Sequence, residues 1–204
     1  MKINKNLWFL IIPIFCIALI TGSFFYTRGI IKANEAAKAN GVIADVFPDA
    51  VRYSEATYNK RFLALYLEEQ GYETTDVVVD HVVYARNEQN AVKGLIVYVN
   101  CYKKFGGLIQ MAVGIQNNGT INGYTILDIS DAKGLESKVK DDDFKNQFIG
   151  KNVSAFVLSD EPHNDAEIEA PNGARDASGT VVNGINTAII TLEFIDESMG
   201  GLLE

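Results

Sequence analysis

The distribution of apolar and polar residues divides the chain into an uncharged first segment and a mixed remainder. Residues 7–25 form an apolar run of 19 residues without a charge. At about 1.5 Å per residue, a helix of this length nearly spans a hydrocarbon core of roughly 30 Å. The run predicts a transmembrane anchor. A cleaved signal peptide is the alternative, although no small-residue cleavage site follows the run. Lys2 and Lys5 favour a cytoplasmic N-terminus and an extracytoplasmic domain.

Helical spacing of apolar residues marks two segments after this run. An alanine-rich stretch predicts a helix over residues 30–44, interrupted near Gly41 and broken by residues 47–49. Residues 54–70 predict a second helix, with Gly71 as its stop. The apolar positions of this second helix are Tyr58, Phe62, Leu65 and Tyr66.

Runs of β-branched residues then replace the helical spacing. They predict four strands, over residues 77–83, 93–102, 107–116 and 120–129. Between the last two strands, Asn117-Asn118-Gly119 is a strong hairpin signal, because Asn and Gly tolerate positive φ. Further elements are predicted over residues 141–149 (helix), 153–158 (strand) and 180–195 (helix).

This order of elements predicts the fold class. Helices, then strands, then mixed elements indicate an α+β domain with an antiparallel sheet and flanking helices. We expect this domain over residues 29–204, behind an N-terminal membrane anchor over residues 1–28.

Composition excludes several functional classes. The chain carries 18 basic and 26 acidic residues, for a formal net charge of −8, so a nucleic-acid partner is not expected. Only two cysteines (Cys16, Cys101) and two histidines (His81, His163) are present, without a CxxC pattern. We therefore expect no zinc, haem or iron–sulfur site built by this chain alone.

Four segments in the second half of the chain carry a family resemblance. Residues 103–115 (KKFGGLIQMAVGI) and 118–127 (NGTINGYTIL) alternate turns and strands, and residues 131–136 (DAKGLE) and 144–151 (FKNQFIGK) follow. In this order they resemble the FMN-binding domain of the G subunit of Rnf-type ion-translocating ferredoxin:NAD oxidoreductases. The C subunit of the sodium-pumping NADH:quinone reductase is a relative of that protein. The resemblance covers nearly the whole chain.

The resemblance implies a function as well as a fold. It implies an electron-carrier subunit in the cell membrane, without catalytic activity of its own. The partners that it implies are the other integral membrane subunits of an Rnf-type complex. In such a scheme the cofactor performs the redox chemistry, while the protein positions and tunes it.

In this family the last threonine of an S/T-G-A-T element carries FMN through a phosphoester bond. The matching region here is residues 176–185 (DASGTVVNGI), in which Ser178 and Gly179 match the opening. Without a gap, the attachment position is Val181, which has no hydroxyl; deletion of the alanine places Thr180 there instead. The resemblance thus implies covalent FMN on Thr180. It places Ser178, Gly179, Gly134, Leu135, Gly106 and Gly107 around the flavin.

Alternative interpretations stay open, because this element and the 131–136 loop both depart from the family pattern. The second interpretation is a flavin-free structural or assembly subunit of the same complex, and the third is an anchored binding domain outside any such complex. Single residues also have structural explanations. Ser178 is suited to be a helix N-cap, Gly106-Gly107 a turn, and His81 a hydrogen-bonded histidine.

Overall fold

The computed structural model describes residues 41–73, 75–102, 107–130 and 135–198. The predicted anchor over residues 7–25 and its boundary at residue 28 lie outside these ranges, so both stay predictions. Within the described ranges, no helix has the length and apolar character needed to cross a membrane. The residues from Val42 onward form one compact unit.

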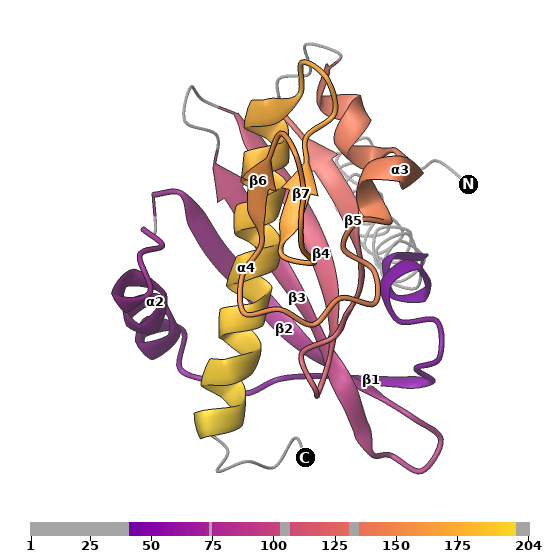
Figure 1. Ribbon diagram of the computed structural model, residues 1–204. Helices are drawn as coiled ribbons and strands as arrows, with labels where there is room; N and C mark the ends of the chain where they lie inside the picture. The colour runs from indigo at the N-terminus through magenta and orange to yellow at the C-terminus, as the bar shows by residue number, and fades with distance from the viewer. Residues whose placement is uncertain (1–40, 74, 103–106, 131–134, 199–204) are drawn as a thin grey trace, which may run out of the picture. The chain divides into compact units, whose positions relative to one another are not determined.

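A five-stranded antiparallel sheet in the order β1-β2-β3-β4-β5 forms the centre of this unit (Figure 1). Its strands are β1 (Arg52–Glu55), β2 (Val77–Arg86), β3 (Val92–Tyr102), β4 (Leu108–Gln116) and β5 (Ile121–Ile129). The α+β class and the four predicted strands are therefore confirmed.

The edge strand β1 corrects the prediction of a helix from residue 54. All four of its residues are exposed. The segment buries no apolar side chain at alternate positions, which is the pattern that would indicate a strand. Its strand conformation comes from antiparallel pairing with β2, where Ser54 lies opposite Tyr84 and Glu55 opposite Val83. A helix prediction based on side-chain spacing could not anticipate this backbone pairing.

The connection between β4 and β5 confirms the predicted hairpin. Gly119 has a φ of 86°, a conformation that costs a glycine little. The side chain of Asn118 accepts a hydrogen bond from the backbone N–H of Thr120 at 3.0 Å. Local sequence chemistry is sufficient for this turn.

Helix α2 (Lys60–Glu69) is shorter than predicted and turns a different face to the core. The side chain of Asn59 caps its start by accepting bonds from the N–H groups of residues 61 and 62. Leu63 and Leu67 are buried, whereas Phe62 and Leu65 of the predicted apolar stripe are 60% and 50% exposed.

Helix α4 (Arg175–Ser198) covers the same face of the sheet and contacts β2, β3 and β4 (Figure 1). It begins five residues before the predicted start at residue 180 and ends three residues after the predicted end. At Gly184 the helix lies so close to the sheet that a Cβ atom would be 2.5 Å from Met111 Sδ and 2.8 Å from Cys101 Sγ. A glycine is therefore required at this contact.

The remaining elements connect the sheet to α4 along the chain. They are η1, a 3₁₀ helix (Leu135–Lys140), α3 (Asp142–Lys145), β6 (Val157–Ser159) and β7 (Glu167–Glu169). The helix predicted over residues 141–149 is reduced to α3, and the strand predicted over 153–158 is shifted to β6. β6 pairs in parallel with β7, which the sequence did not indicate.

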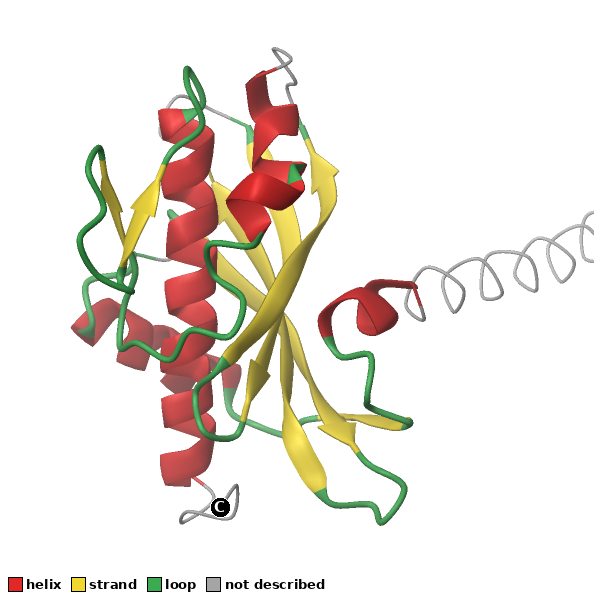
Figure 2. Cartoon of the chain, turned by 45° about the vertical axis from the view of Figure 1, so that its right-hand side comes forward, coloured by secondary structure: helices red, strands yellow, loops and turns green. Residues whose placement is uncertain are grey.

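The opposite face of the sheet is covered by the segment 41–50. Residues 41–46 are helical, and Figure 2 shows this helix across the sheet from α4. The predicted interruption near Gly41 stays a prediction, because the residues before Gly41 lie outside the described ranges, whereas the predicted break at 47–49 is confirmed. Val46 and Phe47 are buried here; a Cβ at Gly114 would collide with the carbonyl of Val46.

Candidate functional site

The segments that carry the family resemblance lead to one end of the sheet. In register, Ile109 at the start of β4 lies opposite Ile129 at the end of β5, and Ser130 Oγ accepts a bond from Leu108 N–H at 2.7 Å. The N-terminal end of α4 lies at this end too, because Lys138 of η1 donates to the carbonyl of Asn172 at 2.9 Å. The fold therefore brings together the ends of the predicted site segments.

Three of the glycine and leucine residues predicted near the flavin cannot be placed in full. Gly106 and Gly134 lie outside the described residues, and of Leu135 only the backbone is described, at the start of η1. Gly107 has a φ of 96°, which agrees with the structural interpretation of a turn. Their predicted roles toward a flavin stay predictions.

Ser178 does not start a helix, which corrects its interpretation as an N-cap. It lies inside α4, where its backbone N–H and its Oγ both donate to the carbonyl of Ala174, at 2.8 and 2.9 Å. Its side chain is fully buried. The chain enters the helix earlier, through a turn in which the Ala174 N–H donates to Pro171 and Gly173 has a φ of 79°. Gly179 likewise lies within the helix, in ordinary contact with Leu158.

Thr180 lies in the second turn of α4. Its Oγ1 donates to the carbonyl of Asp176 at 2.9 Å, and the residue is only 9% exposed. At about 100° per residue, Thr180 lies about 40° around the helix from Gly184, the position that contacts β3 and β4. Thr180 is thus a mostly buried residue whose hydroxyl is bonded within its own helix.

The backbone around Thr180 offers no free N–H groups that could bind a phosphate. Only the first N–H groups of a helix lack an intrahelical acceptor, and here they belong to residues 174–177. Thr180 lies roughly 7.5 Å further along the axis than Arg175, the first helical residue. In the first turn Asp176 adds a negative charge, while the guanidinium of Arg175 pairs with Asp160.

An FMN phosphoester does not fit at this position in the described conformation. It would bury a phosphate anion at a residue that is 9% exposed, within a helix whose backbone amides are already bonded at this position. Val181, the alternative attachment position, has no hydroxyl and is fully buried. The altered motif is thus part of the packed interior.

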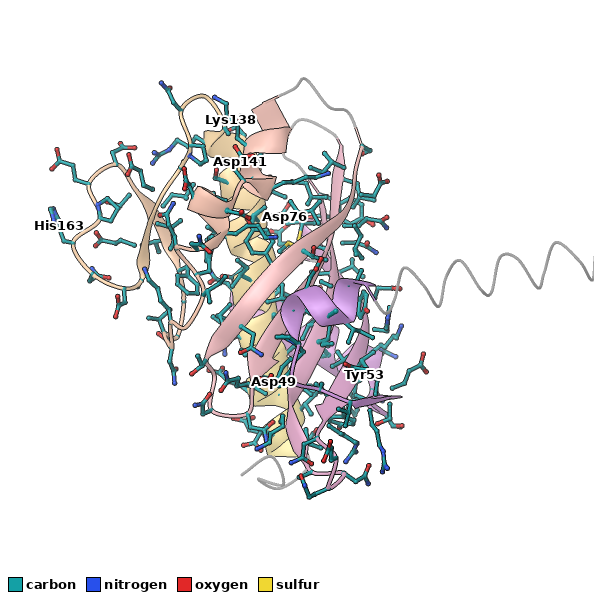
Figure 3. All side chains as sticks on the ribbon, turned by 90° about the vertical axis from the view of Figure 1, so that its right-hand side faces the viewer. Asp49, Tyr53, Asp76, Lys138, Asp141 and His163 are labelled. Carbon is teal, nitrogen blue, oxygen red and sulfur yellow. The ribbon has the colours of Figure 1, made fainter. Side chains whose placement is uncertain are left out.

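Other candidate groups also have structural explanations. His81 Nδ1 lies 2.8 Å from Asp80 Oδ2, and its ring stacks on Tyr98 at 4.0 Å. His163 lies on an exposed loop, apart from the other residues labelled in Figure 3. Burial raises the pKa of the Cys101 thiol to about 12, so the thiol is unreactive at neutral pH. The described residues contain no group of three potential metal ligands.

Two buried polar residues, Asn186 and Tyr124, link elements of the fold by hydrogen bonds. Neither role was predicted from the sequence. The Asn186 side chain on α4 donates to the carbonyl of Phe156 at 3.0 Å and accepts from its N–H at 2.8 Å. The Tyr124 hydroxyl on β5 donates to the carbonyl of Val139 in η1 at 2.5 Å. A lone polar residue within an apolar run was the only available signal in each case.

Comparison with known proteins identifies relatives of the chain. No protein-family model matches it. It is 28% identical over 87 residues to the G subunit of the proton-translocating ferredoxin:NAD(+) oxidoreductase complex of Clostridium ljungdahlii. That match covers 43% of this chain and 47% of the relative. The G subunit of the ion-translocating oxidoreductase complex of Methanosarcina acetivorans is 24% identical over 178 residues, 84% of either chain. The chain resembles the Rnf G subunits.

Among solved structures, Shewanella oneidensis NqrC matches this G-like chain with a TM-score of 0.49 and 13% sequence identity. The match covers 76% of this chain and 74% of NqrC. The antiparallel α+β architecture of the G-like chain follows from its own coordinates. The predicted resemblance is confirmed by the two curated relatives.

Proposed function

We propose that the chain is a membrane-anchored, G-type subunit of an ion-translocating oxidoreductase complex. The match to the Methanosarcina protein over 84% of both chains supports this assignment. In this proposal residues 1–28 anchor the subunit in the cell membrane, with the N-terminus in the cytoplasm. The domain from residue 29 onward is extracytoplasmic and contacts the integral membrane subunits.

The burial of Thr180 supports the flavin-free form of this function. An electron carrier with FMN on Thr180 needs a hydroxyl that a flavin transferase can reach. Here that hydroxyl is bonded to the Asp176 carbonyl and belongs to a residue that is 9% exposed. The proposed subunit therefore works without a covalent flavin on α4, as a structural or assembly component of the complex.

In the flavin-free form, the residues of the motif stabilise the domain. The Ser178 and Thr180 hydroxyls satisfy backbone carbonyls of their own helix, and Gly184 allows α4 to lie against β3 and β4. α4 in turn holds the segment before β6 through Asn186. Each part of the altered motif thus has a role in packing.

The intact mass of the purified chain tests this proposal. The chain is co-expressed with a flavin transferase, together with a second protein that carries an unaltered S/T-G-A-T element as the positive control. We expect the control to gain the mass of FMN minus water and this chain to remain unmodified. A mass gain that disappears in Thr180→Ala but persists in Ser178→Ala would refute the flavin-free form.

A second measurement tests membership in the complex independently. The full chain carries an affinity tag and is purified from mild detergent extracts of its own cells. We expect the other subunits of an ion-translocating oxidoreductase to co-purify with it. If the chain purifies alone, the interpretation as an anchored binding domain outside any complex replaces the proposal.

A further inference from the structure

The surface of the α2–α4 pair carries apolar side chains that the fold does not bury. α2 lies beside the C-terminal half of α4 (Figure 1). The rings of Tyr66 on α2 and Phe194 on α4 meet with their centroids 5.5 Å apart. Phe62, one turn before Tyr66 on α2, and Leu65, which precedes Tyr66 directly, are 60% and 50% exposed. These four residues form what we term the α2–α4 patch.

Tyr66 and Phe194 pack against the core, but packing inside this chain does not explain the exposed Phe62 and Leu65. Residues at i, i+3 and i+4 share one face of a helix, so Phe62, Leu65 and Tyr66 form a continuous stripe. The core face of α2 is formed by Leu63 and Leu67 instead. An exposed apolar stripe beside a second helix is typical of a surface that another polypeptide covers.

Three carboxylates lie at the Tyr66 end of the patch. Desolvation raises the pKa of Tyr66, and the negative charges of Glu197, Glu193 and Glu69 raise it further, so all three lie near its hydroxyl. Each of these glutamates is exposed. Within the described part of the chain, none of the three forms an ion pair.

The charge of the patch indicates which occupant fits. Anionic lipid headgroups would be repelled by the three glutamates. A second copy of this chain would bring the same three carboxylates into the interface, with Lys60 and Arg61 as the only cations of α2 to offset them. A segment that combines apolar residues with lysine or arginine would instead fill the stripe and neutralise the surrounding carboxylates.

We infer that the α2–α4 patch binds a basic, amphipathic segment of another subunit of the complex. Phe62 and Leu65 are the apolar anchors, and Glu69, Glu193 and Glu197 pair with its cationic side chains. The inference rests on the proposed membership in an oxidoreductase complex, and it adds the surface and the chemistry of the contact.

Photo-crosslinking in the assembled complex tests the inference. Phe62→p-benzoylphenylalanine is introduced into the tagged full chain in its own cells, and the crosslinked peptides are identified by mass spectrometry. Ile149→p-benzoylphenylalanine is the matched control, because Ile149 is 47% exposed and lies outside the patch. We expect Phe62 to crosslink to a peptide of another subunit that contains lysine or arginine among apolar residues.

Neutralising the three glutamates is the second part of the test. With Glu69→Gln, Glu193→Gln and Glu197→Gln combined, we expect about a tenfold lower yield of the crosslink from position 62. Three exposed carboxylates outside the patch serve as the control set, and their neutralisation should leave the yield unchanged. The control substitutions are Asp143→Asn, Glu161→Gln and Glu169→Gln.

Several outcomes would overturn the inference. Crosslinks to a second copy of the chain or to lipid would assign another occupant. A yield no higher than at Ile149, or one unaffected by the neutralisation, would show that the patch does not bind in this way. If the complex still co-purifies in these cases, the proposed function stands and only this inference fails. If no other subunit co-purifies, both fail.

Discussion

Gly184→Ala tests whether this glycine of the motif region serves packing. A Cβ at this position would lie 2.5 Å from Met111 Sδ and 2.8 Å from Cys101 Sγ. Both sulfur-containing side chains are fully buried, so they can make room only by repacking within the core. The substitution therefore overpacks the interface between α4 and the sheet.

Two opposing effects set the change in the free energy of unfolding that Gly184→Ala causes. Overpacking a core costs typically about 1–3 kcal/mol. Alanine is favoured over glycine in a helix interior by about 1 kcal/mol, which offsets part of that cost. We expect the net free energy of unfolding to fall by roughly 0.5–2 kcal/mol.

Urea unfolding followed by circular dichroism measures this change. Gly179→Ala on the same helix is the control, because its Cβ would meet only Leu158 Cδ1, at an ordinary 3.7 Å. That control should gain about 0.5–1 kcal/mol, since alanine replaces glycine without a clash.

A double substitution separates the clash from other effects. If the Met111 side chain causes the clash, Gly184→Ala should lower the free energy of unfolding less in a Met111→Ala background than in the native one. Residues in contact couple by about 0.5–3 kcal/mol. A Gly184→Ala protein at least as stable as the parent would refute the claim that α4 is held this close to the sheet.

Three further predictions concern buried polar groups. Asn186→Ala leaves the N–H and carbonyl of Phe156 without partners, so we expect a loss of about 2–4 kcal/mol in thermal or urea unfolding. The exposed Asn183→Ala should change stability by less than about 0.5 kcal/mol, and equal effects would contradict the role of Asn186. Tyr124→Phe removes the hydroxyl that donates to η1, and unfolding should show a loss of about 1 kcal/mol; no loss would mean that this bond contributes nothing. Burial raises the pKa of Cys101 from 9.0 to about 12, so its stabilisation is complete below pH 9 and is lost as the pH rises toward 12. Unfolding measured from pH 8 to 11 should show less of this decline in Cys101→Ala than in the parent, and identical slopes would disprove the linkage.

Local sequence chemistry was sufficient for the central sheet. The β-branched runs of β2 to β5 and the Asn118-Gly119 turn predicted four strands and their hairpin, because both signals depend on neighbouring residues. The order of the motifs also predicted the resemblance that the two curated relatives confirm.

Helix boundaries and faces required the tertiary structure. No cap-forming side chain stands at Ala174, whereas Ser178 is a preferred cap residue, so it indicated a start that lies inside α4. On α2, Phe62 and Leu67 are both apolar, and only the position of the sheet and α4 decides which of them is buried.

The sequence by itself determined the fold class, the four strands β2 to β5 and the family that the chain resembles. The position of Thr180 in the second turn of α4, and its burial, required the tertiary structure. There its hydroxyl is bonded to the Asp176 carbonyl, and the residue is 9% exposed. Accessibility depends on where α4 begins and how closely Gly184 lets it approach β3 and β4, and both are properties of long-range packing.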